Sequence, residues 1–543
     1  MGRRVLYAVF FLFRASLLLH QSCCSRSFRT STSEATRRRN SWMPTSLSLS
    51  DDDYSSLFPN GTGVSRSDFP SDFLFGAITS AMKHEGAELV DGKSLNIWDQ
   101  YARNVRGASL DGSIPGECGD NYYQYSEDHD LVVGLGMNAY RMSIAWSRIY
   151  PNSSGVVNQI AIEHYNKVID DALDKGLELF VTLWTQDHPH YIDNTYMGPL
   201  NYTFVEDFVT YANTCFAAFG DRVKYWITFD EPNDYAGLAY ATNQNPPGRC
   251  TSGIENYGKC WEGDSGTEPY TVGHHLLLAH AEAVNLYRTS YQESQNGSIG
   301  ITLWHRWFEP LTNTSSDLAA SQRATDFLLG WFLDPILYGD YPASMKEYAG
   351  DRLPEFSSEE SAKLNGSIDF LGLNVITAFY AYEYDFYEED YPNTTCYYLD
   401  PKAAMTGERD GVAIGVGDHD YAVPWIIRKT LEYIKYKYNN FPSYITQIGW
   451  GIELSSDEDE NLNDDQRVEY FMTYYQQLLA AVEEGANVKG VFAWSLLDGF
   501  EFNLGMQIRL GIHYVDDSFN RYAKKSAKWF KAMLADNSTS DST

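Results

Sequence analysis

Eight short apolar runs recur along the chain, and longer stretches with helical spacing separate them. The runs cover residues 73–77, 137–144, 177–184, 225–229, 298–303, 368–375, 443–446 and 490–494. Between them, residues 160–169 (IAIEHYNKVI) repeat apolar side chains at the spacing of an amphipathic helix. Buried strands that alternate with helical crossovers are typical of a parallel sheet. We therefore predict an α/β fold, a single (β/α)8 TIM barrel with long βα loops.

An open, doubly wound parallel sheet is the structural alternative to a closed barrel. That fold is expected to carry a glycine-rich phosphate turn after its first strand, and residues 78–84 (ITSAMKH) contain no glycine. In a closed barrel, the loops at the carboxyl ends of the strands line one mouth, where the chemistry gathers. Polar residues follow the predicted strands at Arg141, Asp187, Asp230, Glu231, Asn374, Gln447 and Glu501. A single such residue is usually a loop residue or a helix cap, but several at one mouth favour a site.

Composition and charge exclude some partners. The chain has 543 residues with a formal net charge of −32, so phosphate backbones would be repelled and no nucleic-acid partner is expected. The densest acidic run, residues 457–460 (DEDE), is interpreted as a solvated loop. Aromatic residues make up 15% of the chain, which slightly favours a cleft for sugars. No segment after the N-terminus is apolar over the roughly 20 residues that a membrane-spanning helix needs.

The N-terminus is expected to lie outside the barrel. Two arginines precede an apolar stretch over residues 5–19 and small residues near 22–25, a pattern that predicts a signal peptide over residues 1–25. Residues 26–67 are rich in Ser, Thr and Arg, which makes a transit peptide the competing interpretation. The barrel is predicted over residues 68–535, and residues 536–543 are predicted to be a flexible tail.

Eight N-x-Ser/Thr triplets decide between the two targeting interpretations. Any one could arise by chance, but eight favour the secretory pathway, with the cell wall or extracellular space, the vacuole or the ER lumen as destination, over a plastid. The triplets begin at Asn60, Asn152, Asn201, Asn296, Asn313, Asn365, Asn393 and Asn537.

In an oxidising compartment the cysteines can form a disulfide. Cys250 and Cys260 lie ten residues apart in a segment that contains Gly, Asn and Pro, so a small disulfide-closed loop is predicted. The spacings C-x-x-C and H-E-x-x-H are absent from the sequence. No metal and no other cofactor are expected.

Several motifs resemble glycoside hydrolase family 1, the β-glucosidase type, in order and over nearly the whole chain after the leader. They are residues 73–81 (FLFGAITSA) with 85–87 (EGA), 140–151 (YRMSIAWSRIYP), 226–232 (WITFDEP), 492–501 (FAWSLLDGFE), 509–516 and 524–527 (KKSA). Residues 248–250 (GRC) and 266–270 (GTEPY) resemble the plant branch of that family. The resemblance implies a (β/α)8 barrel of carbohydrate metabolism that binds or hydrolyses β-glycosides, either small molecules or oligosaccharides.

Retaining hydrolysis needs two carboxyl groups, an acid/base and a nucleophile. Glu231 matches the family's acid/base position. The seventh-strand motif, usually Ile-Thr-Glu-Asn-Gly, reads ITQIG at residues 445–449, so Gln447 stands at the nucleophile position. An amide has no negative charge with which to attack, and losing a nucleophile costs on the order of 10^6 in turnover. We also expect Glu231 to ionise more readily, and to be a poorer acid, beside a neutral Gln447.

The sugar-binding positions that the resemblance implies are altered as well. Arg141, Trp494 and Glu501 match the family's pattern. Other positions depart from it, at Lys83, Thr185, Gln186, Asp230, Val375, Ile376, Ile448 and Phe502. These differences indicate a rebuilt sugar subsite rather than a single lost residue.

Two interpretations of Asp230 stay open. In one, the carboxylate has moved from position 447 to position 230, and Asp230 activates water for single-displacement hydrolysis with Glu231 as the acid. In the other, which is favoured, Lys83 pairs with Asp230 or Glu501 and closes the pocket with a salt bridge. At the level of the whole protein, a hydrolase of β-glycosides competes with a non-catalytic protein that binds glycosides or another protein.

Overall fold

The computed structural model describes residues 58, 61–152, 155–252, 260, 262–386, 395–417 and 420–535. The leader, the C-terminal tail and three of the eight N-x-Ser/Thr asparagines, Asn60, Asn393 and Asn537, lie outside these residues. Eight strands form the central sheet: β1 (Leu74–Ile78), β2 (Ala139–Ser143), β3 (Glu178–Trp184), β4 (Tyr225–Asp230), β5 (Ser298–Pro310), β6 (Phe370–Glu383), β10 (Ser443–Ile448) and β12 (Val488–Ala493). Each coincides with one of the eight predicted runs.

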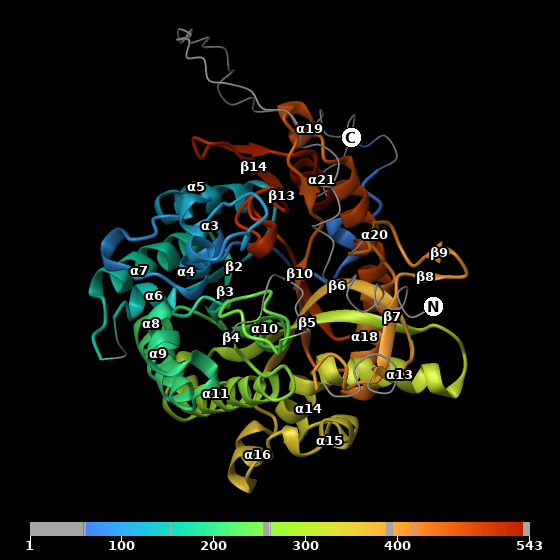
Figure 1. Ribbon diagram of the computed structural model, residues 1–543. Helices are drawn as coiled ribbons and strands as arrows, with labels where there is room; N and C mark the ends of the chain where they lie inside the picture. Colours follow the sequence, from blue (N-terminus) through green and yellow to red (C-terminus); the bar gives the residue numbers. More distant parts are fainter. Residues whose placement is uncertain are drawn as a thin grey trace, which may run out of the picture.

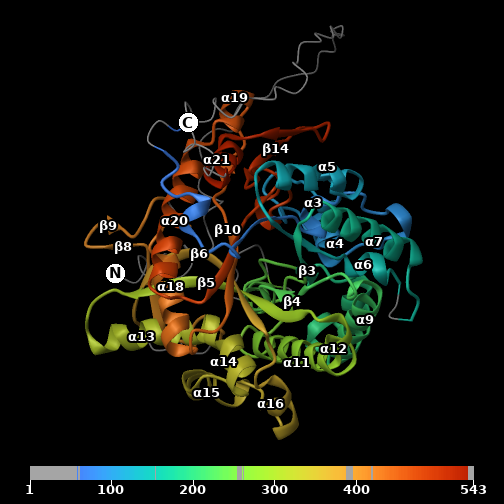
Figure 2. The same cartoon turned by 180° about the vertical axis from the view of Figure 1, so that it is seen from behind.

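All neighbouring strands of this ring pair in parallel, in the order β10-β12-β1-β2-β3-β4-β5-β6, and β6 pairs with β10 to close it. Helices surround the strands, as the two opposite views show (Figures 1 and 2). The predicted (β/α)8 barrel is therefore confirmed, and the open doubly wound sheet is excluded.

The crossover helices and the shorter helices of the loops lie outside the ring of strands (Figure 1). Residues 160–169 belong to α7, as predicted. The helices are α3 (Ala81–His84), α4 (Ile97–Asn104), α5 (Asn121–Gly134), α6 (Trp146–Ile149), α7 (Gln159–Asp174), α8 (His190–Tyr196), α9 (Thr203–Phe219), α10 (Pro232–Tyr240), α11 (Glu268–Ser290), α12 (Gln292–Gln295), α13 (Ser315–Thr325), α14 (Trp331–Tyr338), α15 (Ala343–Ala349), α16 (Ser358–Leu364), α18 (Ile426–Lys437), α19 (Glu458–Leu462), α20 (Asp465–Glu483) and α21 (Lys525–Leu534).

Aromatic side chains fill the interior of the barrel. The ring of Phe180 lies 4.9 Å from that of Phe492, 5.0 Å from that of Tyr444 and 5.9 Å from that of Phe370, centroid to centroid. Gly76 on β1 makes room for this layer, because a Cβ there would lie 2.4 Å from the Phe492 ring. The barrel is thus a packed core, and polar chemistry is left to the mouth above it.

Two strands extend beyond their predicted ends. β5 and β6 stay paired up to the register Pro310↔Ala381, and β7 (Ala403–Thr406) pairs antiparallel with the end of β6. The prediction stopped early because residues 304–310 (WHRWFEP) interrupt the apolar pattern with charged and polar side chains. Short hairpin strands complete the fold: β8 (Glu408–Arg409), β9 (Val412–Ala413), β11 (Ile452–Glu453), β13 (Ile508–Arg509), β14 (His513–Val515) and β15 (Arg521–Ala523).

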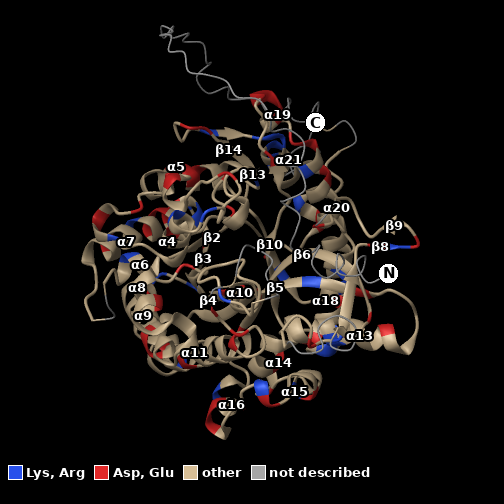
Figure 3. Ribbon diagram, in the orientation of Figure 1, with Lys and Arg blue, Asp and Glu red and all other residues tan. Residues whose placement is uncertain are grey.

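The predicted disulfide is present. Cys250 and Cys260 are bonded, with their Cα atoms 5.3 Å apart, and Cys118, Cys215 and Cys396 are buried thiols. Acidic side chains are scattered over the outer helices, and the densest run forms α19 (Figure 3). Among the helices that the structure describes, none is long and apolar enough to cross a membrane.

Candidate active site

The expected acid, Glu231, lies between strand β4 and helix α10. Its backbone adopts the left-handed conformation, with φ 58° and ψ 41°, and Pro232 begins α10 at the next residue. A non-glycine residue in this region is strained, and such residues concentrate at functional sites. The backbone amide of Glu231 donates to the carbonyl of Thr302 on β5 at 3.0 Å, which fixes this turn at the carboxyl end of the barrel.

The side-chain amide of Asn374 on β6 joins three side chains. Its Nδ2 donates to Oε1 of Glu231 at 2.7 Å, to Oδ1 of Asp230 at 3.1 Å and to Oε1 of Gln447 at 3.2 Å. The hydroxyl of Thr446 donates to Oδ1 of Asn374 at 2.9 Å and so orients the amide. Asn374 is fully buried, whereas the three acceptor residues are partly exposed at the mouth. The structure therefore gathers Asp230, Glu231 and Gln447 around one nitrogen.

Asp230 forms an ion pair inside this cluster. Its Oδ1 lies 2.7 Å from Nη2 of Arg141, the buried arginine in the middle of β2. Arg141 also donates from Nη1 to the carbonyl of Thr446 at 3.2 Å and from Nε to the hydroxyl of Thr182 at 3.2 Å. Arg141 is thus held by β3 and β10 and presents one edge to Asp230.

The environment of Glu231 makes it an acid that stays protonated. Burial, followed by the negative charges of Asp230 and Asp234, raises the pKa of Glu231 to about 8. The expectation that a neutral Gln447 would let Glu231 ionise readily is therefore wrong. The physical reason is first the burial of Glu231, and then the negative charge of Asp230, which takes the place of the charge that position 447 lacks.

Gln447, near the end of β10, keeps the position of a nucleophile without its charge. Its Oε1 and the Oε1 of Glu231 lie within 3.2 Å of the same nitrogen of Asn374. These two contacts keep the oxygens closer together than the roughly 6.5–9.5 Å between the carboxyl groups of single-displacement enzymes. The same holds for the oxygens of Asp230 and Glu231 that accept from Asn374. A retaining arrangement, with its shorter spacing, is compatible with these contacts.

Lys83, from helix α3, fills another part of the mouth. Its Nζ lies 2.8 Å from Oε2 of Glu501, and the two side chains are only 10% and 7% exposed. The ammonium also lies 4.4 Å from the ring centroid of Trp494 and 3.9 Å from that of Phe502. Nε1 of Trp494 donates to Oε1 of Glu501 at 2.9 Å, so both oxygens of that carboxylate are engaged. Of the two predicted partners for Lys83, the structure selects Glu501.

Thr185 and Gln186 follow strand β3. Gln186 has a left-handed backbone, with φ 60°, and its Oε1 accepts from Nδ2 of Asn245 at 2.9 Å. The backbone amide of Thr185 donates to Oδ1 of Asp187 at 3.0 Å. Burial raises the pKa of Asp187 to about 6. Asp187 therefore braces this turn from inside, in keeping with the ordinary role of a polar residue at a strand end.

Most residues of the cluster could be predicted from the sequence, but the central position of Asn374 could not. This residue was recognised only as one of several polar residues at strand ends, and its position on β6 beside β10 was the available signal. Thr446 belongs to the motif at residues 445–449, but the motif gave no indication that its hydroxyl orients Asn374. The charged interruption of β5 at Arg306 was visible in the sequence but did not point to the site.

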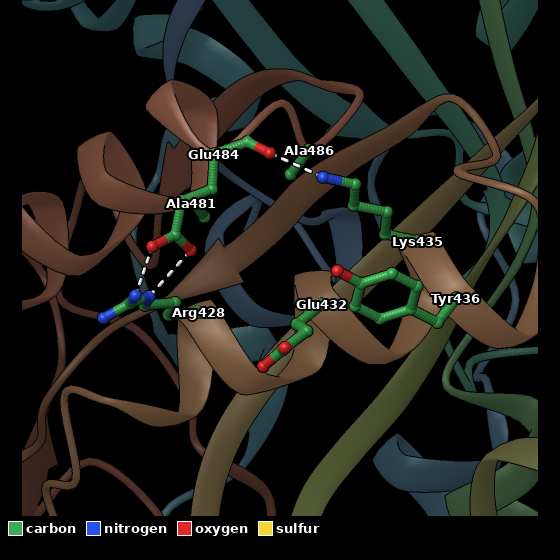
Figure 4. Close-up of a pocket in the computed structure, with 7 residues that line it drawn as sticks. All are labelled: Arg428, Glu432, Lys435, Tyr436, Ala481, Glu484 and Ala486. Carbon is green, nitrogen blue, oxygen red and sulfur yellow. Dashed lines mark hydrogen bonds and ion pairs between the residues drawn. The ribbon is translucent and has the colours of Figure 1, made fainter.

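A surface pocket of about 370 Å³ lies elsewhere, between α18 and α20 on the outside of the barrel. There Arg428 forms an ion pair with Glu484, and Nζ of Lys435 donates to the carbonyl of Glu484 (Figure 4). The charged groups of Arg428, Glu484 and Lys435 thus form their contacts with one another inside the pocket. None of the mouth residues described above lines it.

Comparison with known proteins agrees with this geometry. Residues 65–539 match the model of the family described as glycosyl hydrolase family 1. β-Glucosidase 6 of rice (Oryza sativa subsp. japonica) is 42% identical over 494 residues, which span 88% of this chain and 92% of the rice protein. The coniferin β-glucosidase of Pinus contorta is 44% identical over 480 residues, 87% of this chain and 93% of the pine protein.

The fold comparison gives the same result. A crystal structure of a rice β-glucosidase superimposes with a TM-score of 0.84 at 41% sequence identity, covering 87% of this chain and 100% of the rice chain. A fungal β-glucosidase from Humicola insolens, solved with glucose, superimposes with a TM-score of 0.81 at 38% identity, covering 87% and 98%. With a matching family model over most of its length and relatives above 40% identity, this chain belongs to glycosyl hydrolase family 1.

Proposed function

We propose that this protein binds β-glycosides at the barrel mouth and that its retaining hydrolysis is impaired. One observation carries the proposal: the position opposite Glu231 on the shared amide of Asn374 is occupied by a carboxamide, Gln447. A carboxamide can donate a hydrogen bond to a sugar hydroxyl, but it cannot form a glycosyl ester. Turnover by covalent catalysis is then expected to fall by several orders of magnitude.

Two further contacts support binding with weak turnover. Glu501 already pairs with Lys83, so a sugar must compete with an ammonium for that carboxylate. Asp230, the alternative carboxylate, is held by Arg141 and by Asn374, which leaves it poorly placed to activate water. We therefore favour the glycoside-binding protein over the single-displacement enzyme. The retained acid, with its raised pKa, keeps half of the catalytic pair in place.

The test is an assay of wild type, Gln447→Glu and the double variant Asp230→Asn/Gln447→Glu on a panel of aryl β-glycosides. We expect near-background turnover from wild type, a gain with Gln447→Glu and a larger gain with the double variant. The double variant has two carboxylates around Asn374, as wild type has, whereas the single variant has three. Gln476→Glu, which makes the same change on the exposed face of α20, is the matched control and should stay at background.

The outcomes separate the competing functions. Robust hydrolysis by wild type would refute the assigned role of Gln447. If that hydrolysis inverts the anomeric configuration and is lost in Asp230→Asn, the single-displacement mechanism is correct instead. If wild type is inactive, glycosides should still raise its melting temperature in a concentration-dependent way. An inactive wild type without such a shift points to a protein-binding or structural role.

We also propose that the protein passes through the secretory pathway and carries N-linked glycans. Five of the triplet asparagines lie in the described residues. Four are exposed, namely Asn152, Asn296, Asn313 and Asn365, and Asn201 is half-buried. The disulfide between Cys250 and Cys260 supports an oxidising compartment. Digestion of the protein from its native tissue with an amidase specific for N-glycans should reduce its apparent mass. An unchanged mass would contradict this route.

A further inference from the structure

One arginine beside the active site, Arg306, forms no ion pair with the residues that the structure describes. Arg306 is on strand β5, and its Nε is buried with no hydrogen-bond partner among the residues that the structure describes. The ion pairs of those residues include none to Arg306, whereas the buried Arg141 and Arg148 each have a carboxylate partner. Arg306 is half-buried, so its terminal nitrogens are available to a hydrogen-bond acceptor, from solvent or from a ligand.

The position of Arg306 relative to the catalytic cluster follows from the strand register. Trp304 on β5 pairs with Asn374 on β6, the residue whose amide holds Glu231. Arg306 lies two residues farther along β5, in the direction of the mouth, and two residues along a strand span about 6–7 Å. The register shifts between His305 and Trp307, so Arg306 lies at an irregularity of the strand pairing, beyond Trp304 towards the mouth.

Contacts fix the guanidinium in this place. Its central carbon lies 4.3 Å from the ring centroid of Trp304 and 5.3 Å from that of Phe379. Trp304 is itself clamped, because Asn233 accepts from its backbone N–H at 3.0 Å and donates to its carbonyl at 2.8 Å. Asn233 belongs to the first turn of α10, two residues after Glu231. The short segment from Glu231 to Asn233 thus positions both the expected acid and Trp304, whose ring lies against the guanidinium of Arg306.

The neighbouring carboxyl groups do not cancel this cation completely. Asp234 and Asp420 influence Arg306 through their charges. Burial raises the pKa of Asp234 to about 7, although Arg306 opposes the shift, so near neutrality Asp234 carries only part of its charge. The same surroundings include aromatic rings, Trp304 and Phe379.

We propose that Arg306 binds the carboxylate of an aromatic aglycone, so that the preferred ligands are β-glycosides of hydroxylated aromatic acids. The inference rests on the proposed function, because it assumes that the sugar occupies the mouth beside Glu231. The carboxylate pairs with the guanidinium through two parallel N–H···O bonds, and the two terminal nitrogens, Nη1 and Nη2, are the donors. Trp304 and Phe379 hold the guanidinium plane and present apolar surface to the aromatic ring of the aglycone.

The test measures binding of two nearly isosteric ligands to the full protein by calorimetry. The ligands are 4-carboxyphenyl β-glucoside, which is anionic, and 4-carbamoylphenyl β-glucoside, which is neutral. We expect wild type to bind the acid at least about tenfold more tightly than the amide, the range of a charge-assisted hydrogen bond. In Arg306→Gln this ratio should fall to about one.

Matched variants control for folding and for general charge. Arg409→Gln removes another arginine that stacks on an aromatic ring, Tyr380, at 4.5 Å, and it should keep the wild-type ratio. If Arg306→Gln does not fold, Arg306→Lys keeps the charge but loses the two-pronged donor, and its ratio should fall between those of wild type and one. A wild-type ratio near one, or an unchanged ratio in the Arg306 variant, would overturn the proposal.

Free 4-hydroxybenzoate separates failure of this proposal from failure of the proposed function. If neither glycoside binds but 4-hydroxybenzoate binds and does so only with Arg306 present, glycoside binding is refuted and the anion site stands. If both glycosides bind equally well, glycoside binding stands and the anion site is refuted. If none of the three ligands binds, both proposals fail.

Discussion

Replacing Lys83 by methionine should expose the energetic cost of the salt bridge at the barrel mouth. Methionine keeps most of the apolar length that packs between the Trp494 and Phe502 rings, but it removes the ammonium 2.8 Å from Glu501. The carboxylate is then left 7% exposed and without its cation. Breaking a buried pair in this way costs about 3–5 kcal/mol, so we expect a free energy of unfolding lower by that amount at pH 7.5.

The cost should depend on pH in a defined direction. Burial, opposed by Lys83, already raises the pKa of Glu501, and loss of Lys83 must raise it further. A carboxyl group whose folded pKa is raised destabilises the fold as pH rises from its unfolded value, about 4.3, towards the folded value. The penalty of Lys83→Met should therefore shrink at pH 4.5, where the unpaired Glu501 of the variant takes up a proton and no longer buries a negative charge.

Urea unfolding followed by tryptophan fluorescence, extrapolated linearly at pH 4.5 and 7.5, measures both effects. The double variant Lys83→Met/Glu501→Gln should recover most of the loss at pH 7.5, because it leaves no buried charge. Lys346→Met, which breaks an exposed pair with Asp340, should change stability by less than about 1 kcal/mol. A penalty that is equal at both pH values, or a double variant that loses the sum of the single losses, would refute the reasoning.

Three further results are expected. In the Gln447→Glu background, activity should fall as pH rises through the raised pKa of Glu231. Adding Asp230→Asn removes a like charge and should move this alkaline limb of the pH–rate profile to lower pH. A limb that does not move would contradict the coupling between Asp230 and Glu231. Cys250→Ala removes a disulfide between cysteines ten residues apart and should lower the free energy of unfolding by about 2–3 kcal/mol. Its melting temperature should equal that of wild type measured in the presence of a reductant. Gly76→Ala forces a Cβ to within 2.4 Å of the Phe492 ring and should cost about 1–3 kcal/mol in urea unfolding, whereas an unchanged midpoint would mean that the barrel interior yields.

The barrel could be predicted because its strands are buried on both faces. Each of the eight strands therefore reads as a continuous apolar run, and the helices between them show their own period. The outer end of β5 could not be predicted, since charged and polar side chains such as His305 and Arg306 interrupt the apolar run there. The end predicted for β6 came too early for a different reason, because this strand stays buried up to Ala381 and its apolar residues continue past residue 375.

The residues of the candidate site could be predicted from the sequence, but their charge states and ion pairs could not. Strand ends and motif resemblance indicated Glu231 and Gln447, whose proximity the structure bears out. The protonation of Glu231 depends on its distance from Asp230 and on how far both side chains are shielded from water. The sequence alone gives neither quantity, even though the two residues are adjacent. For the same reason the sequence left two partners open for Lys83, and only the fold brings it to Glu501 across more than 400 residues.

The shared amide of Asn374 constrains how this protein could have diverged from its relatives. One NH2 group with two hydrogens serves three acceptors, and two of these carry carboxyl groups. A glutamate at 447 together with aspartate at 230 would place three carboxyl groups around it. Exchange at position 447 before position 230 avoids that crowded intermediate, whereas the opposite order passes through it. The order of the two substitutions is therefore biased, and a glutamate can return to position 447 without that crowding only if position 230 first loses its carboxylate.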